Sequence, residues 1–199
     1  MSKINMHRFR KYIILIAILF AAVLMTSCSK TAKYANVAEN ETITSLSPDG
    51  KYRAEAYGTI TEITAGGLYP YEGIRILKTD NEDVIWELKA GGYTVNFIWS
   101  PDSQYVGIYY TGRIWGESLI VDINAKEQID LPTLEEIASH YGDSVKPQED
   151  RPDPYFEIRS WKDPESVIVD FRWTKENGEE FTGQYTFNIK TNEVIYQDA

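Results

Sequence analysis

The sequence predicts an all-β protein, built as an antiparallel meander of about three four-stranded units with one short helix inserted near residues 133–142. Two observations carry this prediction. Apolar and polar residues alternate with a period of two over short segments that are rich in aromatic and β-branched side chains. The gaps between these segments are short and carry turn residues, so consecutive strands are expected to pair as antiparallel neighbours.

The alternation is clearest in four segments, at residues 95–99, 119–123, 167–173 and 185–189. In the first, Val95, Phe97 and Trp99 occupy every second position, which predicts a strand with one face more buried than the other. The intervening turns are expected at residues 48–50, 79–83, 124–126, 176–179 and 190–192, where Gly, Pro, Asn and Asp are concentrated.

One segment follows a helical pattern instead. Its apolar residues at helical spacing are Leu134, Ile137, Ala138 and Tyr141. Thr133 and Glu136 have the spacing of a capping box, and Gly142 is a natural helix stop. We therefore expect one short helix here, followed by a proline-rich loop over residues 145–154.

A turn motif recurs along the chain. Ser47-Pro48-Asp49-Gly50-Lys51-Tyr52 precedes one alternating strand, and Trp99-Ser100-Pro101-Asp102 precedes another 53 positions later. A degenerate third copy begins near Trp161. Proline presets φ for the turn, Asp bonds back to the backbone, and glycine permits a positive φ, so Pro48, Asp49, Gly50, Pro101 and Asp102 are interpreted as structural turn residues.

These motifs resemble the TolB-type β-propeller repeat, whose signature is a Trp-Ser-Pro-Asp-Gly-Lys turn between the first two strands of a blade. The resemblance implies three blade-like units, at about 42–90, 94–130 and 155–198, within a single domain spanning 41–199. Propellers typically close with four to eight blades. Three arrangements therefore stay open: an open stack of units, a sandwich-like pair of sheets, or a propeller completed by another chain.

The N-terminus carries a targeting pattern. Four basic residues, at positions 3, 8, 10 and 11, precede an apolar run over residues 12–24. Met25-Thr26-Ser27-Cys28 then resembles the lipobox of bacterial lipoproteins, although that pattern prefers leucine where Met25 stands. The resemblance implies a signal peptide at 1–27, a diacylglycerol on the Cys28 thiol and a flexible tether over 28–40.

This interpretation predicts a protein held by lipid on the extracytoplasmic face of a bacterial cell membrane. Two acyl chains anchor a domain stably, since each buried methylene contributes about 0.8 kcal/mol. An ordinary secretory signal and an uncleaved transmembrane anchor are the alternatives, but the apolar run is short for a membrane span of about 20 residues.

Charge and composition exclude several classes of function. Four of the 20 basic residues and none of the 30 acidic ones lie in the signal, so the chain from Cys28 onward carries a net charge of −14. Such a surface repels nucleic acid, and we expect no nucleic-acid partner. Because Cys28 is the only cysteine, no internal disulfide is available.

The residues also argue against an enzyme. His140 is the only histidine after the signal, so a zinc site of the usual His/Cys type cannot be built and no catalytic histidine constellation is expected. Gly142-Asp143-Ser144-Val145 superficially resembles the nucleophile block of a family of serine esterases, but no histidine follows it. We expect no catalytic residue, no metal and no cofactor.

Two loops suggest a binding surface. In a meander, the loops that join the second and third strands of each unit emerge at one end, here residues 65–73 and 112–117. Tyr69, Tyr71, Arg113 and Trp115 stand among glycines in these loops and are predicted to form a shallow platform for a peptide or sugar. The alternative is that these rings fold back over the sheet as core.

Three hypotheses of function follow. The first is a non-enzymatic binding or accessory module for an envelope protein, peptide or glycan. The second is a hydrolase that acts on cell-wall glycans through two carboxylates, which must lie about 5–9.5 Å apart in a cleft. The third is a structural subunit whose open sheet edge completes the β-sheet of a partner.

Overall fold

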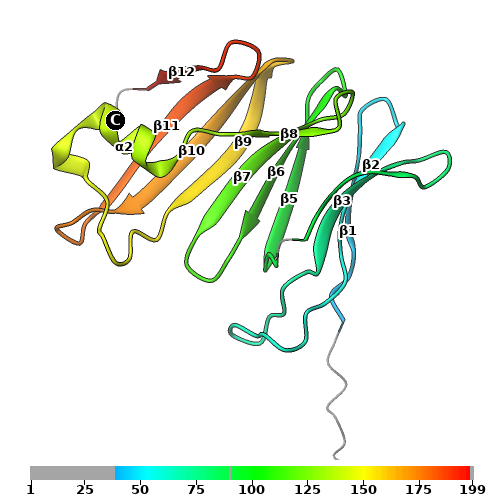
Figure 1. Ribbon diagram of the computed structural model, residues 1–199, viewed down its shortest axis with the longest axis horizontal. Coiled ribbons are helices and arrows are strands. Elements are labelled where there is room, and N and C mark those ends of the chain that lie inside the picture. Colours follow the sequence, from blue (N-terminus) through cyan, green and yellow to red (C-terminus); the bar gives the residue numbers. More distant parts are fainter. Residues whose placement is uncertain (1–38, 90, 198–199) are drawn as a thin grey trace, which may run out of the picture. The chain divides into compact units, whose positions relative to one another are not determined.

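The computed structural model describes residues 39–89 and 91–197, and these form twelve strands and one short α-helix (Figure 1). The predicted signal peptide, Cys28 and nearly all of the predicted tether lie outside the described residues. Among the residues described, no helix is long and apolar enough to cross a bilayer. The fold class predicted from the sequence is confirmed: the protein is mostly strand, the sheets are mostly antiparallel, and neither closes into a barrel.

The first sheet has four strands in the order β1-β2-β3-β4. Their bounds are β1 Ile43–Leu46, β2 Tyr52–Tyr57, β3 Gly73–Lys78 and β4 Val84–Leu88. All three pairings are antiparallel between consecutive strands, as short turns require. The connection between β2 and β3 is longer than the others in this sheet and forms a hairpin over residues 58–72.

The second sheet has eight strands, in the order β12-β11-β10-β9-β7-β6-β5 with β8 paired to β7. Four of them are β5 Thr94–Trp99, β6 Tyr105–Thr111, β7 Gly116–Asp122 and β8 Glu127–Asp130. The other four are β9 Tyr155–Asp163, β10 Ser166–Thr174, β11 Glu180–Asn188 and β12 Glu193–Tyr196. Each set of four is an antiparallel meander.

The two sets join through a short parallel contact between β7 and β9, at Gly116 and Tyr155. Ser118 reinforces it, because its Oγ donates to the carbonyl of Phe156 at 2.8 Å and accepts from the amide of Ile158 at 3.1 Å. Gly116 makes the approach possible, since a Cβ there would lie 2.6 Å from the Tyr109 hydroxyl and 2.8 Å from the Tyr155 ring. This join between the second and third sets of strands was not predicted from the sequence.

The predicted helix is present as α2, Leu134–Tyr141. Both arms of the capping box form: the Thr133 side chain accepts from the Glu136 amide, and the Glu136 carboxylate accepts from the Thr133 amide. Gly142 ends the helix with φ of 82°. The apolar face of α2 buries Ile137 and Ala138 in the core.

Two clusters of buried side chains form the core. One joins the first sheet to β5–β7, through Ala54, Ala56, Ile74 and Ile76 on one side and Val95, Phe97, Val106, Ile108 and Val121 on the other. The second cluster joins α2 to β9–β11, with Trp173 and Tyr185 fully buried at its centre. The second cluster also contains Tyr105 of β6 and Ile120 of β7, so each four-stranded set shares buried side chains with the next one along the chain.

The first two copies of the turn motif each form a local hydrogen-bond ring. In the first copy the Ser47 hydroxyl donates to Asp49 and accepts from the Tyr52 amide. In the second copy Ser100 makes the same two bonds with Asp102 and Tyr105. The third copy has lysine at the serine position, so it lacks this ring and keeps only the Asp163 carboxylate, which accepts from the Glu165 amide at 2.9 Å.

Candidate binding site

The four residues predicted to form the platform differ in how deeply the structure buries them. Tyr71 is only 8% exposed and packs in the core, with its hydroxyl donating to the Glu41 carbonyl at 3.1 Å. Tyr69 and Trp115 are half-buried, and Arg113 is exposed. Tyr71 therefore belongs to the core, as the alternative interpretation of the loops expected, and Trp115 is the predicted residue that lines a pocket.

This pocket, which we call the Trp115 pocket, has a volume of about 440 Å³. One side is lined by the end of β6, the turn that follows it and the start of β7, which contribute Tyr110, Trp115 and Glu117. Residues of β8 and the segment that leads into α2 form the opposite side, from Gln128 to Glu135. Pro154 and Phe156 close it from the third set of strands.

Trp115 is held in place by the turn that precedes it. The Gly112 amide donates to the Trp115 carbonyl at 2.9 Å, so the chain reverses tightly between β6 and β7. The indole then folds back over Gly112, and its edge packs on the Tyr110 ring at 5.7 Å between centroids and an interplanar angle of 88°. This edge-to-face packing is a favoured geometry for aromatic pairs, so the indole has a defined orientation.

The charged side chains that line the Trp115 pocket are all acidic. Three carboxylates line it, from Glu117, Asp130 and Glu135, and the lining contains no lysine, arginine or histidine. Burial and then the neighbouring carboxylates of Glu117 and Asp130 raise the pKa of the Tyr110 phenol. The phenol stays protonated at neutral pH and donates to the Glu117 carboxylate at 3.0 Å.

This lining is suited to a cation. Aromatic faces attract ammonium and guanidinium groups, and carboxylates supply the counter-charge. Leu131, Pro132 and Leu134 add apolar surface that would pack against the aliphatic stem of a long basic side chain. Within the described part of the chain, no group of three or more His, Cys, Asp or Glu residues could hold a metal ion.

A second, larger pocket of about 630 Å³ lies on the face of the third set of strands that carries Tyr155 and Arg172. Glu157 and Asp170 are direct cross-strand partners on its floor. Arg159 forms ion pairs with both, at 2.7 and 3.2 Å, and Gln184 donates to Asp170 at 2.6 Å. Arg172 stacks on the Tyr155 ring at 3.8 Å and pairs with Glu180. Each charged side chain of this lining therefore has an ion-pair partner close by.

The carboxylate pair in the larger pocket is the nearest approach to the hydrolase hypothesis. That chemistry needs one carboxyl group to act as a proton donor and the other to attack or to activate water. Arg159 forms ion pairs with both Glu157 and Asp170, and Gln184 also donates to Asp170, so neighbouring side chains of the same face engage both carboxylates. The geometry favours a structural network in this pocket over a general acid.

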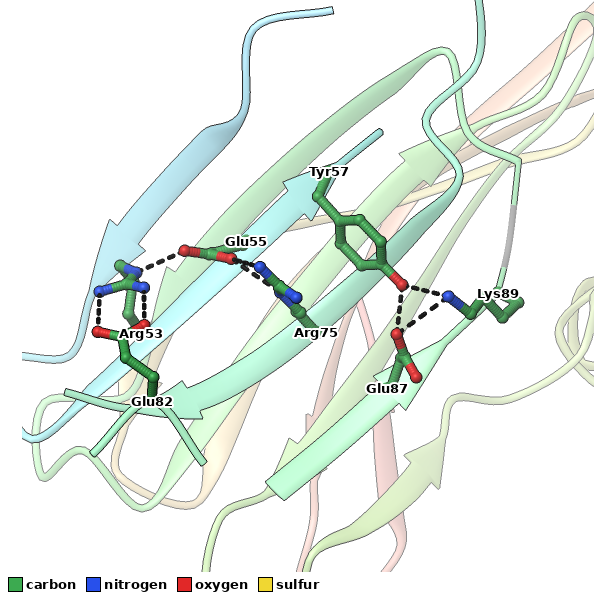
Figure 2. A network of polar contacts seen from close by, with 7 residues as sticks. All are labelled: Arg53, Glu55, Tyr57, Arg75, Glu82, Glu87 and Lys89. Atoms are coloured by element: carbon green, nitrogen blue, oxygen red, sulfur yellow. Dashed lines mark hydrogen bonds and ion pairs between the residues drawn. The ribbon is translucent and has the colours of Figure 1, made fainter. Parts of the chain in front are cut away.

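A third polar cluster covers the outer face of the first sheet (Figure 2). Glu55 lies between Arg53 and Arg75, with contacts of 2.6 and 2.8 Å, and Arg53 also pairs with Glu82. Beside it, the Tyr57 hydroxyl bonds to Glu87 and Lys89.

Glu55 is the most enclosed member of this network, with only 5% of its surface exposed. Burial alone would raise the pKa of Glu55, but hydrogen bonds from Arg53 and Arg75 outweigh burial and lower it. The positive and negative groups of this face neutralise one another, so the face offers no uncompensated charge to a ligand.

Sequence reasoning found Trp115 but missed Tyr110, Glu117, Asp130 and Glu135. One signal was available: Trp115 stands directly before β7 and Glu117 is the second residue of β7, a spacing of two positions that is typical of side chains on one face of an extended chain. The others come from neighbouring strands and from the first turn of α2, and only the register brings Tyr110 opposite Glu117.

The fold and the site define a protein with a four-stranded and an eight-stranded sheet, mostly antiparallel, and an acidic, aromatic pocket. No protein-family model matches the chain, and no curated protein sequence matches it. Solved structures with some similarity include the apo form of the AtxE2 isopeptidase, with 12% identity and a TM-score of 0.46 over 78% of this chain and 28% of that one.

Two further solved structures are similar to a lesser degree. One is the hydrazine synthase of Kuenenia stuttgartiensis, with 15% identity and a TM-score of 0.39 over 77% of this chain and 36% of that one. The other is TolB from Acinetobacter baumannii, with 13% identity and a TM-score of 0.36 over 79% of this chain and 43% of that one. The chain spans less than half the length of each of these structures.

Proposed function

We propose that the protein is a membrane-anchored, extracytoplasmic binding module that captures a basic side chain of a peptide or protein partner in the Trp115 pocket. The observation that carries the proposal is the lining itself: three carboxylates and three aromatic side chains line a pocket without a single basic residue. The lipobox-like segment ending at Cys28 supports the location.

The net charge supports the same class of partner. A chain with a net charge of −14 after the signal attracts basic partners over several ångströms of solvent and repels acidic ones. The Trp115 pocket concentrates that preference at one point, because its carboxylates lie beside an apolar wall where their interaction with a cation is less screened than at an open surface. The long-range attraction and the local contacts in the pocket would then both favour basic partners.

The experiment is a titration of the purified lipidated chain with a capped hexapeptide of alternating lysine and glycine, followed by calorimetry. The matched probe is the same peptide with glutamine in place of lysine. We expect the lysine peptide to bind and the glutamine peptide to bind at least about tenfold more weakly, a difference of about 1.4 kcal/mol. Affinity for the lysine peptide should fall as salt is added.

Two variants locate the site. Asp130→Asn should weaken the lysine peptide about 3- to 10-fold, since one counter-charge is lost. Glu127→Gln is the matched control, because it removes one charge from the same strand, β8, at a position outside the pocket lining. Equal binding of the two peptides, or equal effects of the two variants, would contradict the proposal. Binding of a neutral oligosaccharide instead would favour the glycan hypothesis.

The third hypothesis, completion of a partner's sheet, has less support. Where the partner is a propeller, a further four-stranded unit would pack on the outer face of the first sheet, and that face carries the network of Arg53, Glu55 and Arg75 in place of an apolar surface. The third set of strands likewise presents Glu157, Asp170 and their arginines. Stacked repeat units end in polar faces where the stack is finished.

A further inference from the structure

The hairpin between β2 and β3 presents an apolar tip to solvent. Leu68 is 60% exposed and Ile63 is 52% exposed, which places both among the most exposed large apolar residues of the described chain. Ala65 and Leu68 exchange both backbone hydrogen bonds at 3.0 Å. Gly66 and Gly67 between them have φ of 60° and 85°, the positive values that a two-residue hairpin turn needs.

The tip stands clear of the rest of the protein. A side-chain carbon added at Gly66 or Gly67 would meet no atom within 4 Å. The base of the hairpin is firmly held, because the Ile60 amide donates to the Pro70 carbonyl at 2.9 Å and the Tyr71 amide donates to the Gly92 carbonyl at 2.9 Å. A rigid base and an open tip keep the two apolar side chains pointing away from the core.

The first described residues of the chain run along this same hairpin. The Asn40 amide donates to the Thr59 hydroxyl at 2.7 Å, and the Asn40 side chain donates to the Tyr69 carbonyl at 2.9 Å. The Tyr71 hydroxyl donates to the Glu41 carbonyl. Asn40 and Glu41, at the start of the described residues, are thus fastened to the hairpin that carries Leu68.

This attachment limits how far the hairpin can be from the membrane. The number of residues from Cys28 to Asn40 limits the distance between these two residues to at most about 40 Å. An anchor at Cys28 therefore holds the hairpin at a high effective concentration next to the lipid. A small apolar contact is enough under that condition, because the anchor has already brought the two surfaces together.

We propose that the tip of the 58–72 hairpin, through Leu68 and Ile63, rests in the bilayer that holds the N-terminal segment of this same chain. The inference depends on the proposed membrane attachment but not on the Trp115 pocket. Residues 58–72 contain Glu62 and Glu72 and no lysine or arginine, so the contact is apolar and requires no anionic lipid. It would orient the domain, with the hairpin end toward the membrane.

The chain offers an unusually clean probe, because its only cysteine is Cys28. Leu68→Cys in the lipidated chain is labelled with an environment-sensitive fluorophore and reconstituted into phosphatidylcholine vesicles, with and without brominated acyl chains. The matched control is Leu46→Cys. Leu46 is also a leucine with 60% exposure, and it lies in the same sheet at the end of β1 away from the hairpin.

We expect the label at position 68 to shift to shorter emission wavelength on reconstitution and to lose at least about half of its emission to brominated chains. The label at position 46 should report water throughout, and raised salt should change neither signal. A water-like signal at position 68, or equal signals at both positions, would overturn the proposed contact.

Two readouts separate this inference from the proposals on which it builds. The wild-type chain should take no label, because a lipidated Cys28 has no free thiol; a labelled wild type would contradict the lipid attachment, and the hairpin contact with it. Peptide binding by the Trp115 pocket is measured by calorimetry on detergent-solubilised chain. If the lysine peptide does not bind while the label at position 68 is buried in the membrane, the result would contradict the proposed function of the Trp115 pocket and would still support the hairpin contact.

Discussion

Gly112 decides where the indole of Trp115 lies. A side-chain carbon on Gly112 would come within 2.2 Å of the indole Cε2 and 2.4 Å of its Nε1. These distances are far below van der Waals contact, which begins near 3.5 Å, so a side-chain carbon at position 112 would force the indole out of its position. The absence of a side chain at one turn residue therefore gives the pocket its aromatic wall, and a bulkier residue there would remove the wall without touching any carboxylate.

We expect Gly112→Ala to displace the indole and to weaken the lysine peptide about tenfold or more in the calorimetric titration, as Trp115→Ala would. The forced shift should also lower the free energy of unfolding by about 1–3 kcal/mol. Gly91→Ala is the matched control, because a Cβ there meets only the Ile60 side chain at 3.3 Å and Pro70 at 3.8 Å. Unchanged peptide affinity in Gly112→Ala would show that the indole does not form part of the binding wall.

The turn motif carries a second function at the scale of the elements, because its tryptophan links one set of strands to the preceding one. The Trp99 indole donates to the Ser45 carbonyl in the first set at 3.3 Å. The Trp161 indole, in the degenerate third copy, donates to the Ile98 carbonyl in the second set at 2.8 Å. Leu46 occupies the equivalent position in the first copy and is exposed, since no described strands precede it to accept such a bond.

We expect Trp161→Phe to lower the free energy of unfolding by about 1–3 kcal/mol, through the lost hydrogen bond and the lost packing on Tyr105. Urea unfolding followed by circular dichroism measures the change.

Leu46→Trp serves as the comparison for this variant. It restores the motif residue where no acceptor is available, so its effect should stay within about 0.5 kcal/mol. Stabilisation by Leu46→Trp as large as the loss in Trp161→Phe would contradict a role for the indole as a link between sets of strands.

Across the whole molecule, stability is tied to pH through the network on the first sheet. The folded protein lowers the pKa of Glu55 below its usual value of 4.5, because Arg53 and Arg75 stabilise the carboxylate more than burial destabilises it. A lowered carboxyl pKa adds stability above the unfolded value and loses it as the pH falls through the folded value. The contribution is therefore present at neutral pH and disappears in acid.

We expect the free energy of unfolding to fall as the pH drops below about 4.5, and Glu55→Gln to flatten that part of the profile. At pH 7 the same variant should cost about 1–3 kcal/mol, because two partly buried arginines lose their shared counter-charge.

Glu82→Gln is the control within the network, since Glu82 is 58% exposed at its side chain and pairs only with Arg53 among the contacts of Figure 2. It should cost about 0–1 kcal/mol. Equal losses of unfolding free energy in Glu55→Gln and Glu82→Gln, at both neutral and acid pH, would show that the enclosed Glu55 carboxylate contributes no more to stability than the exposed Glu82 carboxylate.

Most of the fold could be predicted from the sequence. The alternation at 95–99 and 167–173 corresponds to β5 and β10, and the helix with its capping box lies where Thr133, Glu136 and Gly142 indicated. These features depend on residues a few positions apart, so the sequence displays them directly. The lipid on Cys28 and the cellular location stay predictions, since that segment lies outside the described residues.

The binding site was predicted only in part, and for a different reason. The sequence singled out Trp115, which lines the pocket, but could not tell it from Tyr71, which stands in a similar glycine-rich loop and is buried. Whether a loop aromatic faces solvent depends on what the next set of strands packs against it, and no local pattern encodes that.

By itself, then, the sequence determined the strands, the turns, the single helix, the acidic surface and the targeting pattern, because each is a property of neighbouring residues. The tertiary structure alone decided which carboxylates meet Trp115, that β7 joins β9 beside Gly116, and that Asn40 is fastened to the hairpin of Leu68. Those juxtapositions link residues far apart in the chain. They arise from burying apolar faces against one another, a free-energy gain that is not directional and that only the packed molecule resolves into particular contacts.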